Sequence, residues 1–224
     1  MLLLAADTSG KHGTIALARC GPRDACTLLE VVPLEGGTFS AQLVPQIAAL
    51  LSKHGFTKNE IGGFAVVSGP GSFTGVRVGL AAIKALAEVL QTPIAAVSML
   101  EAIAVSSPAQ GKVIAVMDAG RGEVYAGEYD VGADGARLVK EQLLTRPVLF
   151  ELVRTSLVVT ADHNLAETAV QAGLLVNKIE LPRADAIARL GWRKISAGET
   201  ISSEALDANY LRRPVPEIVA RKSS

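Results

Sequence analysis

The chain has 224 residues, enough for one large domain or for two small lobes with a well-buried core. Hydrophobic residues make up 49% of it and aromatic residues only 4%, so small aliphatic side chains must build the core, which favours parallel sheets covered by helices. Lys plus Arg equals Asp plus Glu at 22 each, which excludes a global field drawing the chain onto nucleic acid or an anionic membrane. We expect an α/β protein that shares any RNA contact with a partner.

Local features of the sequence indicate the cellular compartment of the protein. Residues 1–6 are apolar, but Asp7 interrupts this run too early for a signal peptide, so the run predicts a first strand. Three charges interrupt the most hydrophobic stretch, residues 75–90, so no membrane span is expected. Cys20 and Cys26 lack the Cys or His companions of a zinc site and are expected to be reduced thiols. We predict a cytoplasmic protein.

The first half of the chain predicts the element order βββαβαβ. Short apolar runs separated by Gly, Ser and Pro indicate the strands, and apolar residues at three- and four-residue spacing indicate the helices. The strands are expected at residues 2–7, 13–19, 26–32, 64–68 and 94–97, and the helices at residues 40–54 and 75–90.

The second half appears as a faint repeat of the first, because residues 112–118 again form an apolar run that ends in Asp. Two lobes that share a βββαβα plan, residues 1–107 and 108–224, are what an actin-like or sugar-kinase-like fold would give. Further strands are expected near residues 123–129, 137–144 and 157–160, and helical stretches from 147 and near 165–172 and 184–197.

A glycine turn occupies residues 68–79, with the sequence Ser-Gly-Pro-Gly-Ser-Phe-Thr-Gly-Val-Arg-Val-Gly. Gly69, Gly71 and Gly75 permit positive φ and close backbone approach, while Ser72 or Thr74 can cap the following helix and leave N–H groups for an anion. The spacing matches neither the P-loop nor the dinucleotide fingerprint. These residues favour a tight turn with a helix cap and leave an anion site as the alternative.

Carboxylates follow two strands at corresponding places, in Asp-Thr-Ser at 7–9 and Asp-Ala-Gly at 118–120. Sugar kinases and actin hold metal- and phosphate-handling carboxylates there, and an Asx turn closing a hairpin is the alternative. His12, His54 and His163 lie far apart, so we predict no metal site and no catalytic centre in this chain. The candidate nucleotide- or anion-binding residues are Asp7, Thr8, Gly71, Ser72 and Thr74.

Residues 61–87, which contain the glycine turn, resemble the bacterial TsaB (YeaZ) family. Supporting matches lie at residues 2–9, 40–47 and 117–129, and a weak one at 209–213. The resemblance spans essentially the whole chain and is strong up to about residue 130.

The resemblance implies an actin-like (ASKHA) fold and a role in forming N6-threonylcarbamoyladenosine beside the anticodon of tRNAs that read codons beginning with A. TsaB is the non-catalytic paralogue in that family. Its partner TsaD transfers the threonylcarbamoyl group with a metal held by histidines, and the small ATPase TsaE resets the complex. The chain is thus expected to have no cofactor of its own, with ATP and a metal in partner subunits, and to meet tRNA only within the complex.

The paralogues of this family pair through the first two helices of their N-terminal lobes, here residues 40–54 and 75–90. Both helices are rich in Ala and Leu, so one face would cover the sheet and the surplus could cover a partner. The same helices make a homodimer the expected state without the partner. The candidate contacts are Leu43, Ile47, Leu51, Val76, Leu80 and Lys84.

The sequence departs from the family pattern at two places, and it leaves two alternative functions open. Residues 37–43 contain no histidine where TsaD has its metal motif, and Phe39 stands where many TsaB sequences have one, which favours the non-catalytic assignment. Gly120 replaces the usual Arg, which argues against a role for the Asp118 turn. The alternatives are an ASKHA-type ATPase or sugar kinase using Asp7, and a metallopeptidase, against which the missing ligand pair argues.

Overall fold

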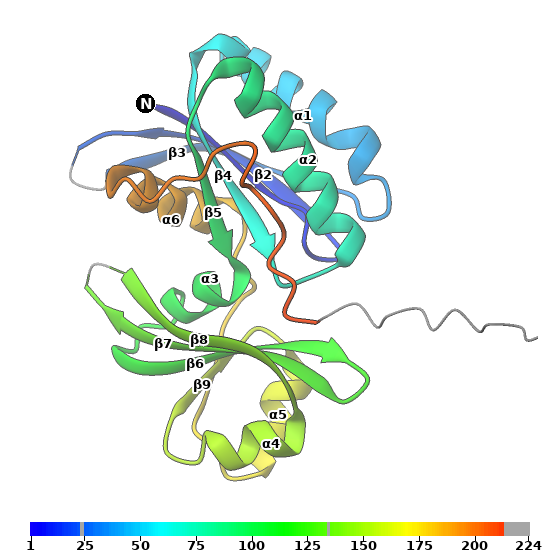
Figure 1. The fold of residues 1–224 in the computed structure, drawn as a ribbon, viewed down its shortest axis with the longest axis vertical. Helices are drawn as coiled ribbons and strands as arrows, with labels where there is room; N and C mark the ends of the chain where they lie inside the picture. Colours follow the sequence, from blue (N-terminus) through cyan, green and yellow to red (C-terminus); the bar gives the residue numbers. More distant parts are fainter. Residues whose placement is uncertain (23–24, 134, 213–224) are drawn as a thin grey trace, which may run out of the picture.

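The computed structural model describes residues 1–22, 25–133 and 135–212. Arg213, the last residue of the weak C-terminal match, lies outside these ranges. The described residues form two five-stranded mixed sheets and six α-helices (Figure 1). The predicted α/β fold with two lobes of βββαβα plan is thereby confirmed.

The first sheet has the strand order β3-β2-β1-β4-β5. β1, β2 and β3 form an antiparallel meander, and β4 and β5 then add parallel to β1. Val, Leu, Ile and Ala fill the central strands, which are buried on both faces as in other sheets covered by helices. The bounds are Leu2–Asp7 for β1, Gly13–Cys20 for β2, Cys26–Leu34 for β3, Ile61–Gly69 for β4 and Ile94–Ser98 for β5.

The second sheet repeats this layout with the order β10-β9-β6-β7-β8. β6, β7 and β8 form the antiparallel meander, and β9 and β10 extend the sheet in parallel on the other side of β6. The bounds are Gly111–Gly120 for β6, Glu123–Gly132 for β7, Gly135–Thr145 for β8, Leu157–Thr160 for β9 and Val176–Lys178 for β10.

Helices cover the outer faces of both sheets, and α3 lies between them (Figure 1). The α3 helix was missed from the sequence because five of its seven residues are buried, so it shows no polar face that would reveal a helical period. The bounds are Phe39–Lys53 for α1, Phe73–Leu90 for α2, Met99–Val105 for α3, Arg146–Leu152 for α4, His163–Gln171 for α5 and Ala184–Ser196 for α6, with a 3₁₀ turn at Lys58–Glu60.

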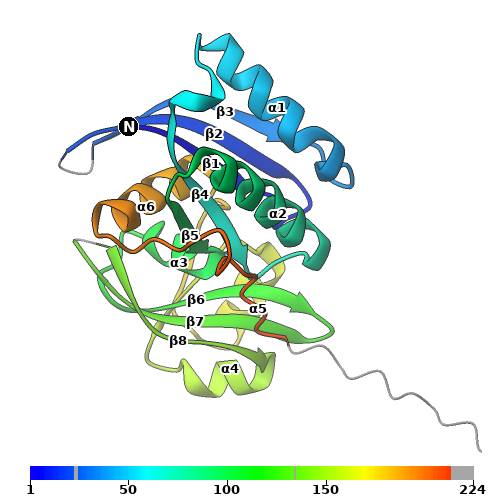
Figure 2. The same ribbon diagram turned by 45° about the horizontal axis from the view of Figure 1, so that its top comes forward.

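The two faces of the first sheet are covered by helices from different halves of the chain. Alternate residues of β1 show this: Leu4 packs in the cluster with α1 and α2, whereas Leu3 packs in the cluster with α6. Figure 2 shows α6 on the opposite side of this sheet from α1 and α2. At Gly191 the contact is so close that a Cβ would lie 2.2 Å from the Ala65 Cβ.

The position of α6 is relevant to the domain boundary predicted between residues 107 and 108. That position separates the strands of the two sheets, and as a domain boundary it stays a prediction. Helix α6 follows this position in sequence but makes two hydrogen bonds to the first lobe, one to β2 and one to the turn after β2. The Ala184 N–H donates to Thr14 Oγ1 at 2.9 Å, and the Trp192 indole donates to the Gly21 carbonyl at 3.1 Å.

Cys20 and Cys26 form a disulfide, which corrects the prediction of reduced thiols. The antiparallel register of β2 and β3 places the two residues directly opposite each other at the end of the hairpin. Their spacing alone did not reveal this register. Among the helices that the structure describes, none is long and apolar enough to cross a membrane.

Candidate functional site

The glycine turn packs against the chain's own first turn. The Ser72 N–H donates to the Ser9 carbonyl at 2.7 Å, and Ser72 Oγ caps α2 by accepting from the Gly75 N–H at 3.3 Å. A Cβ on Gly71 would lie 2.5 Å from the Ser9 carbonyl oxygen, and one on Gly75 would lie 2.0 Å from that of Thr8. Glycine is therefore needed at both positions for the approach of residues 8 and 9.

Asp7 and Thr8 are buried behind this turn and bonded within the chain. Asp7 is 4% exposed, and its Oδ1 accepts from the Ser9 N–H at 2.8 Å and from the Ser9 hydroxyl at 2.6 Å. Thr8 donates its hydroxyl to the Gly75 carbonyl at 2.7 Å. Burial raises the pKa of Asp7, because a charged carboxylate is disfavoured away from water. This geometry is that of an Asx turn.

A cleft of about 630 Å³ lies between the glycine turn and the β6–β7 hairpin of the second sheet. Of the five candidate anion-binding residues, Gly71, Ser72 and Thr74 line this cleft, whereas Asp7 and Thr8 are not among its lining residues. Asp118 lines the opposite side and pairs with Arg146 at 2.9 Å. The structure thus brings part of the predicted set together beside a carboxylate that already has a cationic partner.

The side chains predicted to contact a partner lie mostly inside the protein, which corrects that set. One buried cluster between the first sheet and its two outer helices holds five of them, and the sixth, Lys84, is half-buried and donates to the Glu204 carbonyl at 3.2 Å. Helical spacing identified an apolar stripe, but this stripe faces the sheet. The buried five are Leu43, Ile47, Leu51, Val76 and Leu80.

A second apolar stripe faces outward on the same two helices, and we call it the outer α1–α2 face. Val44 is 49% exposed on α1, and Val89 is 72% exposed on α2. The small side chains beside them leave the helix surfaces smooth, so another helix could approach closely. The exposed apolar members of this face are Ala41, Val44 and Ala48 on α1, and Ala81, Ala85 and Val89 on α2.

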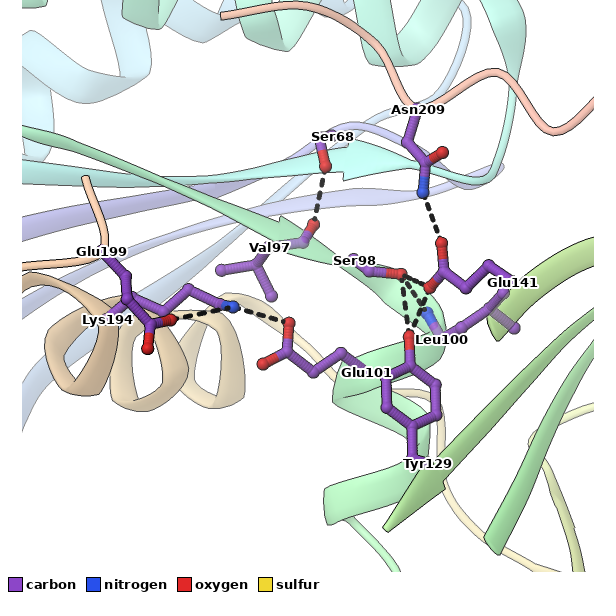
Figure 3. A network of polar contacts seen from close by, with 10 residues as sticks. All are labelled: Ser68, Val97, Ser98, Leu100, Glu101, Tyr129, Glu141, Lys194, Glu199 and Asn209. Atoms are coloured by element: carbon purple, nitrogen blue, oxygen red, sulfur yellow. Dashed lines mark hydrogen bonds and ion pairs between the residues drawn. The ribbon is translucent and has the colours of Figure 1, made fainter. Parts of the chain in front are cut away.

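A polar network that the sequence did not reveal joins the lobes (Figure 3). Glu141 on β8 accepts hydrogen bonds from the hydroxyls of Ser98 and Tyr129 and, at 2.5 Å, from the Asn209 amide. Its members come from four separate segments, so no local motif signals them. Burial and the neighbouring Glu141 carboxylate raise the pKa of Tyr129, which keeps that phenol protonated.

A second part of the network pairs Glu101 on α3 with Lys194 on α6 at 3.1 Å. Burial raises the pKa of Glu101, and the Lys194 charge opposes this effect. Both parts line a cleft of about 770 Å³ between the lobes. Because Ser98 of the first lobe and Asn209 of the C-terminal segment both bond to Glu141 of the second sheet, we call the network an interlobe clamp.

Within the residues that the structure describes, no group of three or more His, Cys, Asp or Glu side chains could hold a metal ion. Phe39 lines the 630 Å³ cleft and packs against Gly13, where a Cβ would lie 2.9 Å from the ring. The Phe39 side chain therefore has a packing role at this position.

Comparison with known proteins gives consistent matches along the chain. Residues 31–188 match the family model described as TsaD, tRNA N6-adenosine threonylcarbamoyltransferase. The tRNA threonylcarbamoyladenosine biosynthesis protein TsaB of Bacillus subtilis (strain 168) is 31% identical over 95% of this chain and 94% of its own length. The protein of the same name from Escherichia coli (strain K12) is 27% identical over 96% of each chain. Among solved structures, YeaZ from Pseudomonas aeruginosa has a TM-score of 0.73 and 25% identity, over 94% of this chain and 99% of that one.

Proposed function

Because the chain belongs to the TsaB (YeaZ) family of tRNA threonylcarbamoyladenosine biosynthesis proteins, we propose that it is the non-catalytic subunit that binds and stabilises the transferase TsaD. Its part in forming N6-threonylcarbamoyladenosine is to organise that enzyme. The observation that carries this proposal is the outer α1–α2 face.

The outer face has the composition of a helix-packing surface. Within α1, the charged residue is Lys53 at its last position, so the preceding turns expose Ala, Val, Pro and Ser to solvent. Such a surface costs free energy in water and is stabilised when a complementary apolar surface covers it. TsaD suits this role because the TsaD family model matches residues 31–188, which include both helices. Paired helices from two similar folds would form a four-helix contact with approximate twofold symmetry.

The site geometry supports a role without chemistry in this subunit. A nucleotide-handling carboxylate must present an oxygen to the cleft, but Asp7 is buried and its Oδ1 accepts two hydrogen bonds from Ser9. Asp118 is paired with Arg146. Under this proposal TsaE acts through the TsaD complex, and a second copy of the chain covers the outer face when TsaD is absent.

The test places a charge on the outer face without disturbing the core. Val44→Glu should weaken binding to purified TsaD at least tenfold, because the carboxylate would be buried without a partner. Val170→Glu is the matched control, since Val170 is an exposed helical valine on α5 in the other lobe. Calorimetric titration with TsaD measures both affinities, and thermal unfolding confirms that both variants are folded.

Unchanged affinity of the Val44→Glu variant would show that TsaD does not use this face. Threonylcarbamoyl transfer by the purified chain alone would contradict the non-catalytic role. Substitutions at Ile47 or Leu80 are unsuitable for this purpose, because these side chains are core residues and a charge there would disrupt folding.

A further inference from the structure

A pocket of about 450 Å³ adjoins the glycine turn on the side of α2. Its wall comes from the start of α2, the β6–β7 region and the C-terminal segment, which runs from α6 past α2 toward the second sheet (Figure 1). Phe73, Tyr125 and Tyr210 line it, although the whole chain has only nine aromatic residues, five Phe, three Tyr and one Trp. A third of the aromatic residues of an aromatic-poor protein thus gather at one pocket.

Two of these rings and an arginine form a stacked cluster at the pocket rim. The Arg77 guanidinium lies 3.8 Å from the centre of the Phe73 ring, and its Nε donates to the Tyr210 hydroxyl at 2.5 Å. The Phe73 and Tyr210 ring centres are 5.3 Å apart. Phe73 remains 55% exposed despite both neighbours. A large apolar ring held in place at the surface is a ready stacking partner for a planar group.

The charge around the cluster is positive. Arg77 and Arg212 line the pocket, and its lining residues include neither Asp nor Glu. Among the described residues Arg77 has no carboxylate within 4.0 Å, whereas Arg212 pairs with Glu123. Because the chain as a whole is neutral, this local excess of positive charge is a property of the pocket. Guanidinium groups bind phosphate oxygens well and also stack on flat rings.

We propose that this pocket binds an unpaired base of RNA together with its flanking phosphate. Single-stranded and loop regions of RNA are bound through bases that stack on Phe, Tyr and Arg, with arginines holding the backbone. The inference rests on the proposed function, since the family acts in tRNA modification and the RNA is then the tRNA substrate of the complex. It adds a direct contact between this subunit and that RNA.

A protein partner is the competing occupant, because Tyr and Arg are also common at protein interfaces. Two observations favour RNA. The outer α1–α2 face is aliphatic, whereas the pocket combines aromatic rings with an arginine that lacks a carboxylate partner among the described residues. The pocket is also joined to the 630 Å³ cleft through Gly71, Ala119 and Tyr125, and the exposed Lys11 lines that cleft. A chain of phosphates could therefore follow the cationic side chains beyond the first base.

The experiment measures binding of a fluorescein-labelled tRNA that reads a codon beginning with A, by anisotropy at several salt concentrations. The full chain is used both alone and in complex with TsaD. Phe73→Ala should weaken RNA binding about tenfold without changing the salt dependence, because a stacking surface is lost. Arg77→Ala should weaken binding and reduce the slope of log affinity against log salt by about 0.7, because one phosphate contact is lost.

Matched controls separate these effects from general surface changes. Leu152→Ala and Arg154→Ala alter an exposed apolar and an exposed cationic side chain at the end of α4, outside the pocket and the 630 Å³ cleft, and both should bind RNA as the wild type does. Tyr210→Phe should also retain nearly full affinity, because the ring remains.

Three results would overturn the proposal. RNA affinity of Phe73→Ala and Arg77→Ala equal to that of the controls would exclude the pocket as a base site. Loss of TsaD binding by these variants would assign the pocket to the protein interface. Competition by AMP as strong as that by unlabelled tRNA would assign it to a free nucleotide. Failure of the wild-type chain to bind TsaD would instead refute the proposed function, and the titrations of the chain alone would still test the pocket.

Discussion

The closest packing in the glycine turn is at Gly75, and Gly75→Ala tests what that glycine is for. The added Cβ would lie 2.0 Å from the Thr8 carbonyl oxygen, far inside ordinary contact distance, so β1 or α2 must shift. Overpacking of this kind costs about 1–3 kcal/mol. Loss of the hydrogen bond from the Thr8 hydroxyl to the Gly75 carbonyl adds about 1 kcal/mol. The better helix propensity of alanine offsets about 1 kcal/mol of this loss of stability.

The net loss for Gly75→Ala is therefore about 1–3 kcal/mol, which corresponds to a fall in Tm of roughly 2–12 °C in a chain of this length. Differential scanning calorimetry measures it. Gly132→Ala is the control, because a Cβ at that exposed residue meets no atom within 4 Å and its φ is not in the left-handed region. Equal Tm values for the two variants would refute the packing argument, and the glycine would then be needed for something other than Thr8.

Two further predictions concern buried carboxylates. Burial raises the pKa of Asp7 above its ordinary 3.8, so the folded state binds the proton more tightly and its stability falls as pH rises from 3.8 through the raised pKa. Asp7→Asn should therefore gain Tm relative to the wild type as pH increases from 4 to 7, and a constant difference would contradict this. Glu141→Ala leaves the donors of the interlobe clamp unpaired and should lower the free energy of unfolding by about 2–4 kcal/mol in urea. The exposed neighbour Lys140→Ala should change it little, and equal effects would show that the clamp adds no stability.

Local patterns predicted the parts of the fold that local physics decides. The order of strands and helices, except α3 and the short β10, followed from hydrophobic period and turn residues. The sequence offered Ser72 or Thr74 as the cap of α2, and the structure shows Ser72 in that role. The need for glycine at residues 71 and 75 was also predicted. The sequence left open whether a ligand or the chain itself approaches them, and the structure places Thr8 and Ser9 there.

Features that depend on long-range placement were missed. Ile47 and Ala48 are both apolar and adjacent on α1, so periodicity could not decide which of them faces the sheet. The packing of α2 and the first sheet made Ile47 the core residue. Asn209 and Glu141 are 68 positions apart, and their contact depends on the path of the C-terminal segment. The disulfide depended in the same way on strand register.

The position of α6 determines how the protein can be assembled and divided. Residues 184–196 are synthesised after the strands of both sheets, yet they cover one apolar face of the first sheet. Until then Leu3, Ala65 and Val97 lack their covering helix. The first sheet is therefore covered only after the second sheet has been made, and a fragment ending at residue 107 would expose an apolar sheet face that favours aggregation. Genetic dissection into separate lobes must carry α6 with the first lobe, for example by circular permutation.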